Sequence, residues 1–443
     1  MHFNVLIVGE TGCGKSTAAL HLLNDVGGQV VALDQQADST AWLLHKAFLS
    51  LGRQAVYDKL DDQERHFPVN LLDPAEGIAW ERNIEELIET LIRRRGSANV
   101  DANPLIELWT ELWCRLIPPH WTLKKALQIF RNGDVFNEAI DLCRDDECRS
   151  AWLDLPAHAA SRERITGAAE RLVSILGKET IACRTYRGTN TFLKMIDDGW
   201  SFLSDGGQVI PQGMVRFIIA TRLKQLNRYK MAGGKAEPTV VIEESEAGEM
   251  LGRQEAIAIQ TLRKTGIKYI IICQEPFWID DQVTDIVMQN TNHMWFRCGS
   301  QKVAELAAKD LCGVMFNPRA IKEHLERPFQ IGDDKYIEKR VNYYTPAEQM
   351  GLIVKWVMSL PVGACFARSG ETVRYCQFPK WHLNYCDELA EQKRKTQPWL
   401  ISTGGTGTRA GSSFMNDIRT PFPRQSGRDS FPPTRSPLDD SDE

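Results

Sequence analysis

The chain has 443 residues, 43% of them hydrophobic and 25% charged, which is the composition of a soluble globular protein with room for two to three domains. Its formal net charge of −5 excludes a chain that is basic throughout, so a nucleic-acid surface would have to be a local patch. The 11 cysteines include no CxxC pair, and the nearest two, Cys143 and Cys148, have no histidine cluster beside them. This pattern indicates reduced thiols and neither a zinc site nor disulfides. No stretch approaches the roughly twenty apolar residues of a membrane helix, so we predict no membrane span.

The first seventeen residues carry the most specific motif. Residues 3–8 are apolar and rich in β-branched side chains, as in a buried strand. The full phosphate-binding loop pattern Gly9-x-x-x-x-Gly14-Lys15-Ser16 follows, and helix-forming residues come next. Glycines let backbone N–H groups surround a polyphosphate, the lysine reaches the β- and γ-phosphates, and the serine hydroxyl binds Mg²⁺. We therefore predict binding of ATP and Mg²⁺ by Gly9, Glu10, Thr11, Gly12, Cys13, Gly14, Lys15, Ser16 and Thr17, with Cys13 a tolerated small residue and no catalytic thiol.

Residues 28–34 predict a second strand, which ends in Asp34. A strand, a helix and a second strand form a βαβ unit and hence a parallel sheet. Because ligands gather at the carboxyl ends of such strands, Asp34 either touches the nucleotide site or caps the next helix.

The stretch from about 75 to 200 changes to helical periodicity. Predicted helices cover residues 79–95, 104–116, 122–131 and 161–176. We interpret residues 76–199 as an all-helical insertion in a domain formed by residues 1–75 and 200–395. Trp109 and Trp113 could stack on bases, but their helical spacing favours core packing.

A long helix with a basic side is predicted over residues 212–231. This side faces either solvent or nucleic acid, and we favour solvent. The basic residues are Arg216, Arg222, Lys224, Arg228 and Lys230.

The second informative stretch is the apolar strand 239–245, which ends in Glu243 and Glu244. In many phosphate-loop ATPases such a strand lies beside the first one, its first acid holds the magnesium and its second polarises the attacking water. We therefore expect this strand next to the first, with Glu243 as a metal ligand and Glu244 as the catalytic base. Aspartate is more usual in the first position, so Glu243 is a departure from the pattern.

The strand 268–274 ends in Gln274, at the same predicted sheet edge. Its amide could sense the γ-phosphate, orient water, or make an ordinary strand-end hydrogen bond. Arg263 precedes this strand, on a predicted helix over 256–265, and either acts on a neighbouring subunit's nucleotide or is merely solvated. A strand at 293–298, a helix at 301–311 and a hairpin of 362–368 with 372–378 follow. From 396 to 443 the composition predicts a disordered tail that could recruit an accessory protein.

The order of these features resembles the HerA/FtsK superfamily, and within it the cytosolic part of conjugative coupling proteins of the TraD/TrwB type. The similarity rests on residues 9–17, 240–246 and 262–274. It implies an α/β, RecA-like parallel-sheet P-loop ATPase domain with an inserted all-helical subdomain. It also implies a homo-oligomer, a hexameric ring that translocates DNA and hydrolyses ATP between subunits, with Arg263 acting in trans.

Two alternatives stay open. One is a HerA-like motor subunit that drives a partner nuclease or effector, and the other is a nucleotide kinase or NTP-dependent switch. The membrane anchor usual in coupling proteins and the small barrel usual in HerA proteins have no counterpart in this sequence. The loop at Gly9 leaves no room for a signal peptide, so we expect a cytoplasmic protein.

Overall fold

The computed structural model describes only part of the chain. It covers residues 4–35, 40–62, 65–67, 84, 88, 104–119, 121, 125–126, 128–130, 132–153, 191–206, 212–244, 259–260, 266–277, 281–331, 334–382, 387–397, 399 and 401–402.

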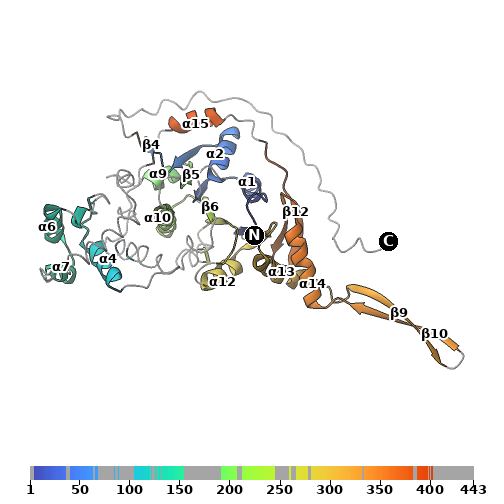
Figure 1. The fold of residues 1–443 in the computed structure, drawn as a ribbon. Coiled ribbons are helices and arrows are strands. Elements are labelled where there is room, and N and C mark those ends of the chain that lie inside the picture. Colours follow the sequence, from blue (N-terminus) through green and yellow to red (C-terminus); the bar gives the residue numbers. More distant parts are fainter. Residues whose placement is uncertain are drawn as a thin grey trace.

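A nine-stranded sheet forms the centre of the fold (Figure 1). Its strands are β1 (Val5–Val8), β2 (Val30–Asp34), β3 (Ala55–Lys59), β5 (Ser201–Asp205), β6 (Thr239–Glu244), β7 (Lys268–Cys273), β8 (Asn292–Trp295), β11 (Ala364–Ser369) and β12 (Thr372–Gln377). Their order across the sheet is β12-β11-β8-β1-β7-β6-β2-β5-β3. All neighbours from β8 to β3 are parallel, and β11 is antiparallel to both of its neighbours. The predicted α/β fold with a RecA-like parallel sheet is confirmed.

Both faces of this sheet are covered by helices. Along β1, Leu6 and Val8 pack into one buried cluster, whereas Val5 and Ile7 pack into the other. This alternation explains why the strands read as continuous apolar runs. The helices are α1 (Lys15–Val26), α2 (Thr40–Ser50), α4 (Pro104–Leu116), α6 (Gly133–Leu142), α7 (Asp146–Leu153), α9 (Thr191–Asp197), α10 (Gln212–Met231), α12 (Asp281–Asn290), α13 (Gln301–Met315), α14 (Pro346–Ser359) and α15 (Asp387–Lys395), with a 3₁₀ helix at Gln128–Phe130.

The strand with the two acids is not adjacent to the first strand, contrary to our expectation. Strand β7 lies between them and pairs in parallel with both β1 and β6. Strands β1, β6 and β7 are all apolar and buried, so their local patterns do not distinguish which strand lies between the other two. Asp34, at the end of β2, is instead the cross-strand neighbour of Glu243 on β6.

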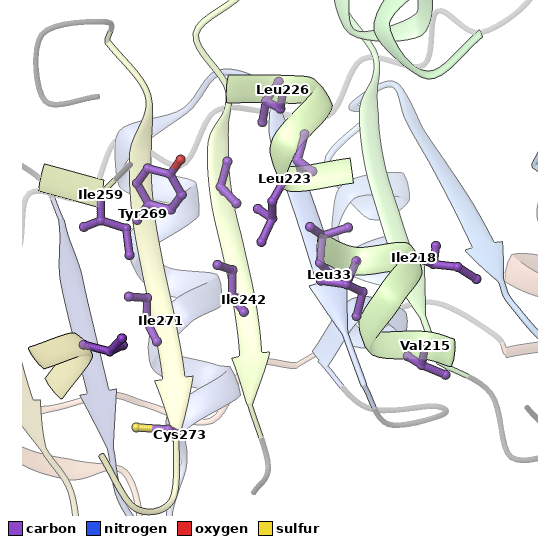
Figure 2. Close-up of a cluster of buried hydrophobic side chains, with 14 of the residues drawn as sticks. Leu33, Val215, Ile218, Leu223, Leu226, Ile242, Ile259, Tyr269, Ile271 and Cys273 are labelled. Carbon is purple, nitrogen blue, oxygen red and sulfur yellow. The ribbon is translucent and has the colours of Figure 1, made fainter. Parts of the chain in front are cut away.

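The basic side predicted for α10 is wrong at Arg222, which is only 1% exposed. The inward stripe of this helix runs through Val215, Ile218, Ile219, Leu223 and Leu226, and position 222 belongs to it by helical spacing. In Figure 2, Val215, Ile218, Leu223 and Leu226 of this helix lie on the side of Leu33 of β2 and Ile242 of β6. The guanidinium of Arg222 lies against the rings of three buried phenylalanines, with 4.6 to 5.1 Å to each ring centroid: Phe67, Phe192 and Phe202.

The described part of the helical block confirms core packing for Trp113, whereas the side chain of Trp109 lies outside the description. The helix over 104–116 has the predicted bounds, and α6, α7 and α9 follow it before β5. Trp113 is fully buried and donates its indole N–H to the carbonyl oxygen of Ala126 at 3.0 Å. The predicted helix at 161–176 and nearly all of that at 79–95 lie outside the described residues, and the limits 76–199 of the insertion stay a prediction.

Two features near the C-terminus have no counterpart among the predicted elements. Strands β9 (Ile321–Ile331) and β10 (Asp334–Tyr343) form a separate antiparallel ribbon that extends from the body beyond α13 and α14 (Figure 1). Strand β13 (Ile401–Ser402) pairs with β4 (Arg65–His66), so ordered pairing occurs shortly after residue 396. In the described part of the chain, no helix has the length and apolarity to cross a membrane.

Candidate nucleotide-binding site

The phosphate-loop residues join the carboxyl end of β1 to the amino end of α1. Gly12 and Gly14 have φ angles of 77° and 107°, which side-chain-bearing residues rarely adopt. The Lys15 ammonium donates to the carbonyl oxygens of Gly9 and Glu10, both at 2.8 Å, and is therefore held across the loop. Since α1 begins at Lys15, its free N–H groups and the positive end of its dipole face the same loop.

Tight packing behind the loop explains its remaining residues. A Cβ atom at Gly9 would lie 2.7 Å from Cβ of Phe296 and 2.8 Å from Sγ of Cys13. Cys13 is 1% exposed, and burial raises the pKa of its thiol. An inert thiol that fills space beneath the loop fits our interpretation of this cysteine as a tolerated small residue.

Beside the loop, two hydroxyl and two carboxyl groups lie together at the ends of neighbouring elements. The Thr40 hydroxyl, at the start of α2, donates to Oγ of Ser16 at 2.6 Å. The carboxyl group of Glu243 is hydrogen-bonded to the side chains of Thr40 and Asp34. Asp34 also accepts the backbone N–H of Ala41 through Oδ2 at 3.1 Å. Asp34 therefore does both things that we considered, because it holds the first turn of α2 and lines the site.

The donor set here suits a hard divalent cation. Burial raises the pKa of the Glu243 carboxyl group, against the lowering effects of the Thr40 hydrogen bond and the Lys15 charge. Its Oε2 atom is shielded from solvent and has no hydrogen-bond partner. Two enclosed carboxyl groups in hydrogen-bond contact need a shared proton or a cation between them. Carboxylate and hydroxyl oxygens, as on Glu243, Asp34 and Ser16, are what Mg²⁺ prefers.

The other predicted catalytic residues are described to different extents. Glu244 ends β6, where its backbone is the partner of Cys273, and its side chain lies outside the description. Gln274 directly follows β7 at the same sheet edge as the loop and is half-buried. Arg263 lies outside the described residues.

Two further segments touch the loop, and the sequence analysis assigned neither of them a role in the site. Arg297, just past β8, forms an ion pair with Glu10, and its carbonyl oxygen accepts the Glu10 N–H at 2.8 Å. Gly363, just before β11, donates its N–H to the carbonyl oxygen of Cys13 at 2.9 Å. The signal for Arg297 was its place after a strand parallel to β1, which brings it to the same edge of the sheet.

Comparison with known proteins finds similarity in structure alone. No protein-family model and no curated protein sequence matches the chain. One similar structure is the bacterial conjugative coupling protein TrwBdeltaN70, in a trigonal form in complex with sulphate. Its sequence is 11% identical to this chain, and the TM-score is 0.56 over 90% of this chain and 88% of that one. The plasmid coupling protein TrwB in complex with ADP and Mg²⁺ is 11% identical with a TM-score of 0.54 over 86% of each chain.

A second protein shares the fold: VirB4 of Thermoanaerobacter pseudethanolicus is 14% identical with a TM-score of 0.50 over 85% of this chain and 89% of that one. The expected resemblance to TrwB-type coupling proteins is thus confirmed at the level of structure. The chain has the fold of the conjugative coupling protein TrwB and of VirB4, with a complete phosphate-binding loop at the carboxyl edge of its central sheet.

Proposed function

We propose that the chain is a Mg²⁺-dependent ATPase that works as a motor on DNA. The observation that carries the proposal is the cluster of Lys15, Ser16, Thr40, Asp34 and Glu243 at one edge of a parallel sheet. A phosphate cradle beside an enclosed carboxyl pair is what a magnesium–nucleotide complex requires. The shared fold with TrwB, which is described with ADP and Mg²⁺ and with ATP and GTP analogues, supports it.

The residues divide the binding work between them. Ser16, Glu243 and Asp34 would hold the magnesium ion, which neutralises phosphate charge and polarises the terminal phosphoryl group when bound. Lys15 exchanges its bonds to the carbonyl oxygens of Gly9 and Glu10 for phosphate oxygens. The loop N–H groups surround the phosphates as Gly12 and Gly14 turn the backbone inward.

Hydrolysis further needs a base and a group that orients water. Glu244 follows the metal-binding residue directly and ends a strand at this edge, which suits it to take the proton of the attacking water. Gln274 directly follows β7, which lies between β6 with Glu244 and β1 with the loop, and we assign its amide to the attacking water or the γ-phosphate. Arg263 is proposed as the arginine that reaches a neighbouring subunit's nucleotide.

We further propose that the chain forms a hexameric ring around DNA. Head-to-tail subunits close into a ring when the rotation between them completes a circle. The fold shared with a conjugative coupling protein supports this assembly and the DNA partner. The tail of residues 396–443 remains our candidate for the binding of an accessory protein.

The test is ATP hydrolysis by the full chain with and without DNA, at several salt concentrations. We expect Mg²⁺-dependent release of phosphate that DNA stimulates, more strongly at low salt because Lys and Arg contacts to phosphate are screened. Equal rates with and without DNA at every salt concentration would refute the DNA motor. Transfer of phosphate to a small acceptor without its release would favour the kinase alternative.

A further inference from the structure

A pair of cysteines faces each other across the antiparallel hairpin of β11 and β12. Cys365 is the direct cross-strand partner of Cys376. Directly opposed residues in antiparallel strands have Cα atoms about 4.5 or 5.5 Å apart, depending on the pair type. Both values fall in the range of about 4.4 to 6.8 Å that disulfides span. The two thiols are hydrogen-bonded to each other, so the sulfur atoms already lie close together.

This pair lies at the end of the hairpin that contacts the phosphate loop. Cys365 is fully buried and belongs to the same apolar cluster as Cys13 of the loop. Two residues before it, Gly363 donates its N–H to the carbonyl oxygen of Cys13 and accepts the N–H of Phe378 at 2.8 Å. The Phe378 ring in turn stacks on Phe296 behind the loop, with 6.2 Å between ring centroids.

The two thiols differ in reactivity. A hydrogen bond from Cys365 and the positive charge of Arg374 lower the pKa of Cys376 to about 7, against the effect of partial burial. The same hydrogen bond and burial raise the pKa of Cys365. Cys376 is also partly exposed. It is therefore a suitable attacking thiolate, with Cys365 placed to resolve the product.

A second pair of neighbouring thiols shows the contrast. Cys143 and Cys148 also contact each other, but burial raises the pKa of Cys148 to about 12, and both residues are buried. Among the described cysteines, thiols are thus hydrogen-bonded to each other in two pairs, whereas a partly exposed thiol with a lowered pKa is found at Cys376.

We propose that Cys365 and Cys376 form a reversible disulfide that restrains Gly363 against the phosphate loop. The oxidant is a low-molecular-weight disulfide of the glutathione type. The Cys376 thiolate attacks one sulfur of that disulfide, a mixed disulfide forms, and one thiolate leaves. Cys365 then loses its proton and attacks the Cys376 sulfur, so a protein disulfide forms and the second small thiol leaves. In total, two protein thiols are oxidised and one small disulfide is reduced to two thiols.

The first test is mass spectrometry of the full chain after treatment with oxidised glutathione. We expect loss of two hydrogen atoms, and after trypsin a disulfide-linked pair of the peptides 356–368 and 375–380. The Cys365→Ser variant should stop at the stable glutathione adduct on Cys376, and Cys376→Ser should react at neither position. Cys312→Ser, which removes a partly exposed cysteine of α13, is the control and should leave the linked pair unchanged. Absence of the linked pair from the wild-type digest would overturn the proposal.

The second test asks whether the bond restrains Gly363, without any measurement of ATP hydrolysis. Closing so short a loop can disfavour its opening by up to about a hundredfold. We expect amide hydrogen exchange in residues 361–366 to slow by at least about tenfold on oxidation and to recover after reduction with dithiothreitol. Exchange that is equal in the oxidised and reduced proteins would refute the restraint on Gly363. Both tests can succeed if the proposed ATPase function is wrong.

Discussion

Substitution of Gly363 by alanine tests whether the β11–β12 hairpin holds the phosphate loop in place. Gly363 has a φ angle of +83°, and an added Cβ would lie 2.7 Å from the carbonyl oxygen of Phe378. A left-handed alanine costs about 1–2 kcal/mol. Because the clashing atom is backbone, relief of the contact adds roughly 1–3 kcal/mol, as overpacking does elsewhere. We therefore expect Gly363→Ala to lower the free energy of unfolding by about 2–5 kcal/mol.

Gly370 offers a matched control in the turn of the same hairpin. Its φ angle is +59°, and no atom lies within 4 Å of an added Cβ. Gly370→Ala should therefore cost only the conformational part, about 1–2 kcal/mol. Urea unfolding of both variants, followed by tryptophan fluorescence, gives the difference. Equal losses in the two variants would refute the argument that the contact with Phe378 matters.

The same pair of variants separates stability from function. Relief of the contact shifts Gly363, whose N–H is bonded to Cys13 in the loop. Calorimetric titration with Mg-ADP should show about tenfold weaker binding for Gly363→Ala, equivalent to about 1.4 kcal/mol. Binding by Gly370→Ala should match the wild type. Unchanged affinity in Gly363→Ala would mean that the hairpin does not position the loop.

The remaining predictions concern the site and one buried base. Lys15→Ala should lose most Mg-ATP binding in an equilibrium assay, and retained wild-type binding would place the nucleotide elsewhere. The Glu244→Gln variant should still bind ATP but hydrolyse it at least about a hundredfold more slowly, because general-base catalysis contributes about that factor. Normal turnover by this variant would show that Glu244 is not the catalytic base. Burial raises the pKa of Glu243 in the folded state, so ionisation of this carboxyl group opposes folding, and Glu243→Gln should make the magnesium-free protein more stable at neutral pH. The gain should begin to shrink as pH falls below the pKa of the folded state and should vanish below the ordinary pKa of a glutamate in the unfolded chain; a gain independent of pH would contradict this. Burial lowers the pKa of His45 to about 4, so between about pH 6.5 and 4 the unfolded chain binds more protons than the folded protein. The free energy of unfolding should therefore fall by about 3 kcal/mol as pH is lowered across that range. His45→Leu should flatten this part of the stability–pH curve, and an unaltered slope would show that another group causes it.

Local patterns predicted the secondary structure of the candidate nucleotide-binding site well. The strand before Gly9, the helix after it and the strand that ends in Glu243 and Glu244 each lie within a few residues of their predicted positions. Each depends on a short contiguous signal, an apolar run followed by glycine or acid. The same holds for the β11–β12 hairpin, whose turn at Gly370 is readable from the alternating residues around it.

Prediction was weakest where one residue type suits two environments. An arginine on a long helix is usually solvated, but Arg222 lies inside because α10 turns that position toward the sheet and aromatic rings surround it. The β9–β10 ribbon was missed because its strands mix charged and apolar residues and nearly all of its described side chains are exposed, so no buried face appears in the pattern.

The sequence by itself determined the phosphate loop, the strands that carry acid or amide groups at their ends, and the α/β class, because these depend on residues adjacent in the chain. Only the tertiary structure decided which strand ends become neighbours. It placed β7 between β1 and β6 and put Asp34 beside Glu243, and it brought Gly363 onto the loop from almost the other end of the described chain. The order of parallel strands is set by how helices pack on both faces, and that is a long-range property that no local pattern encodes.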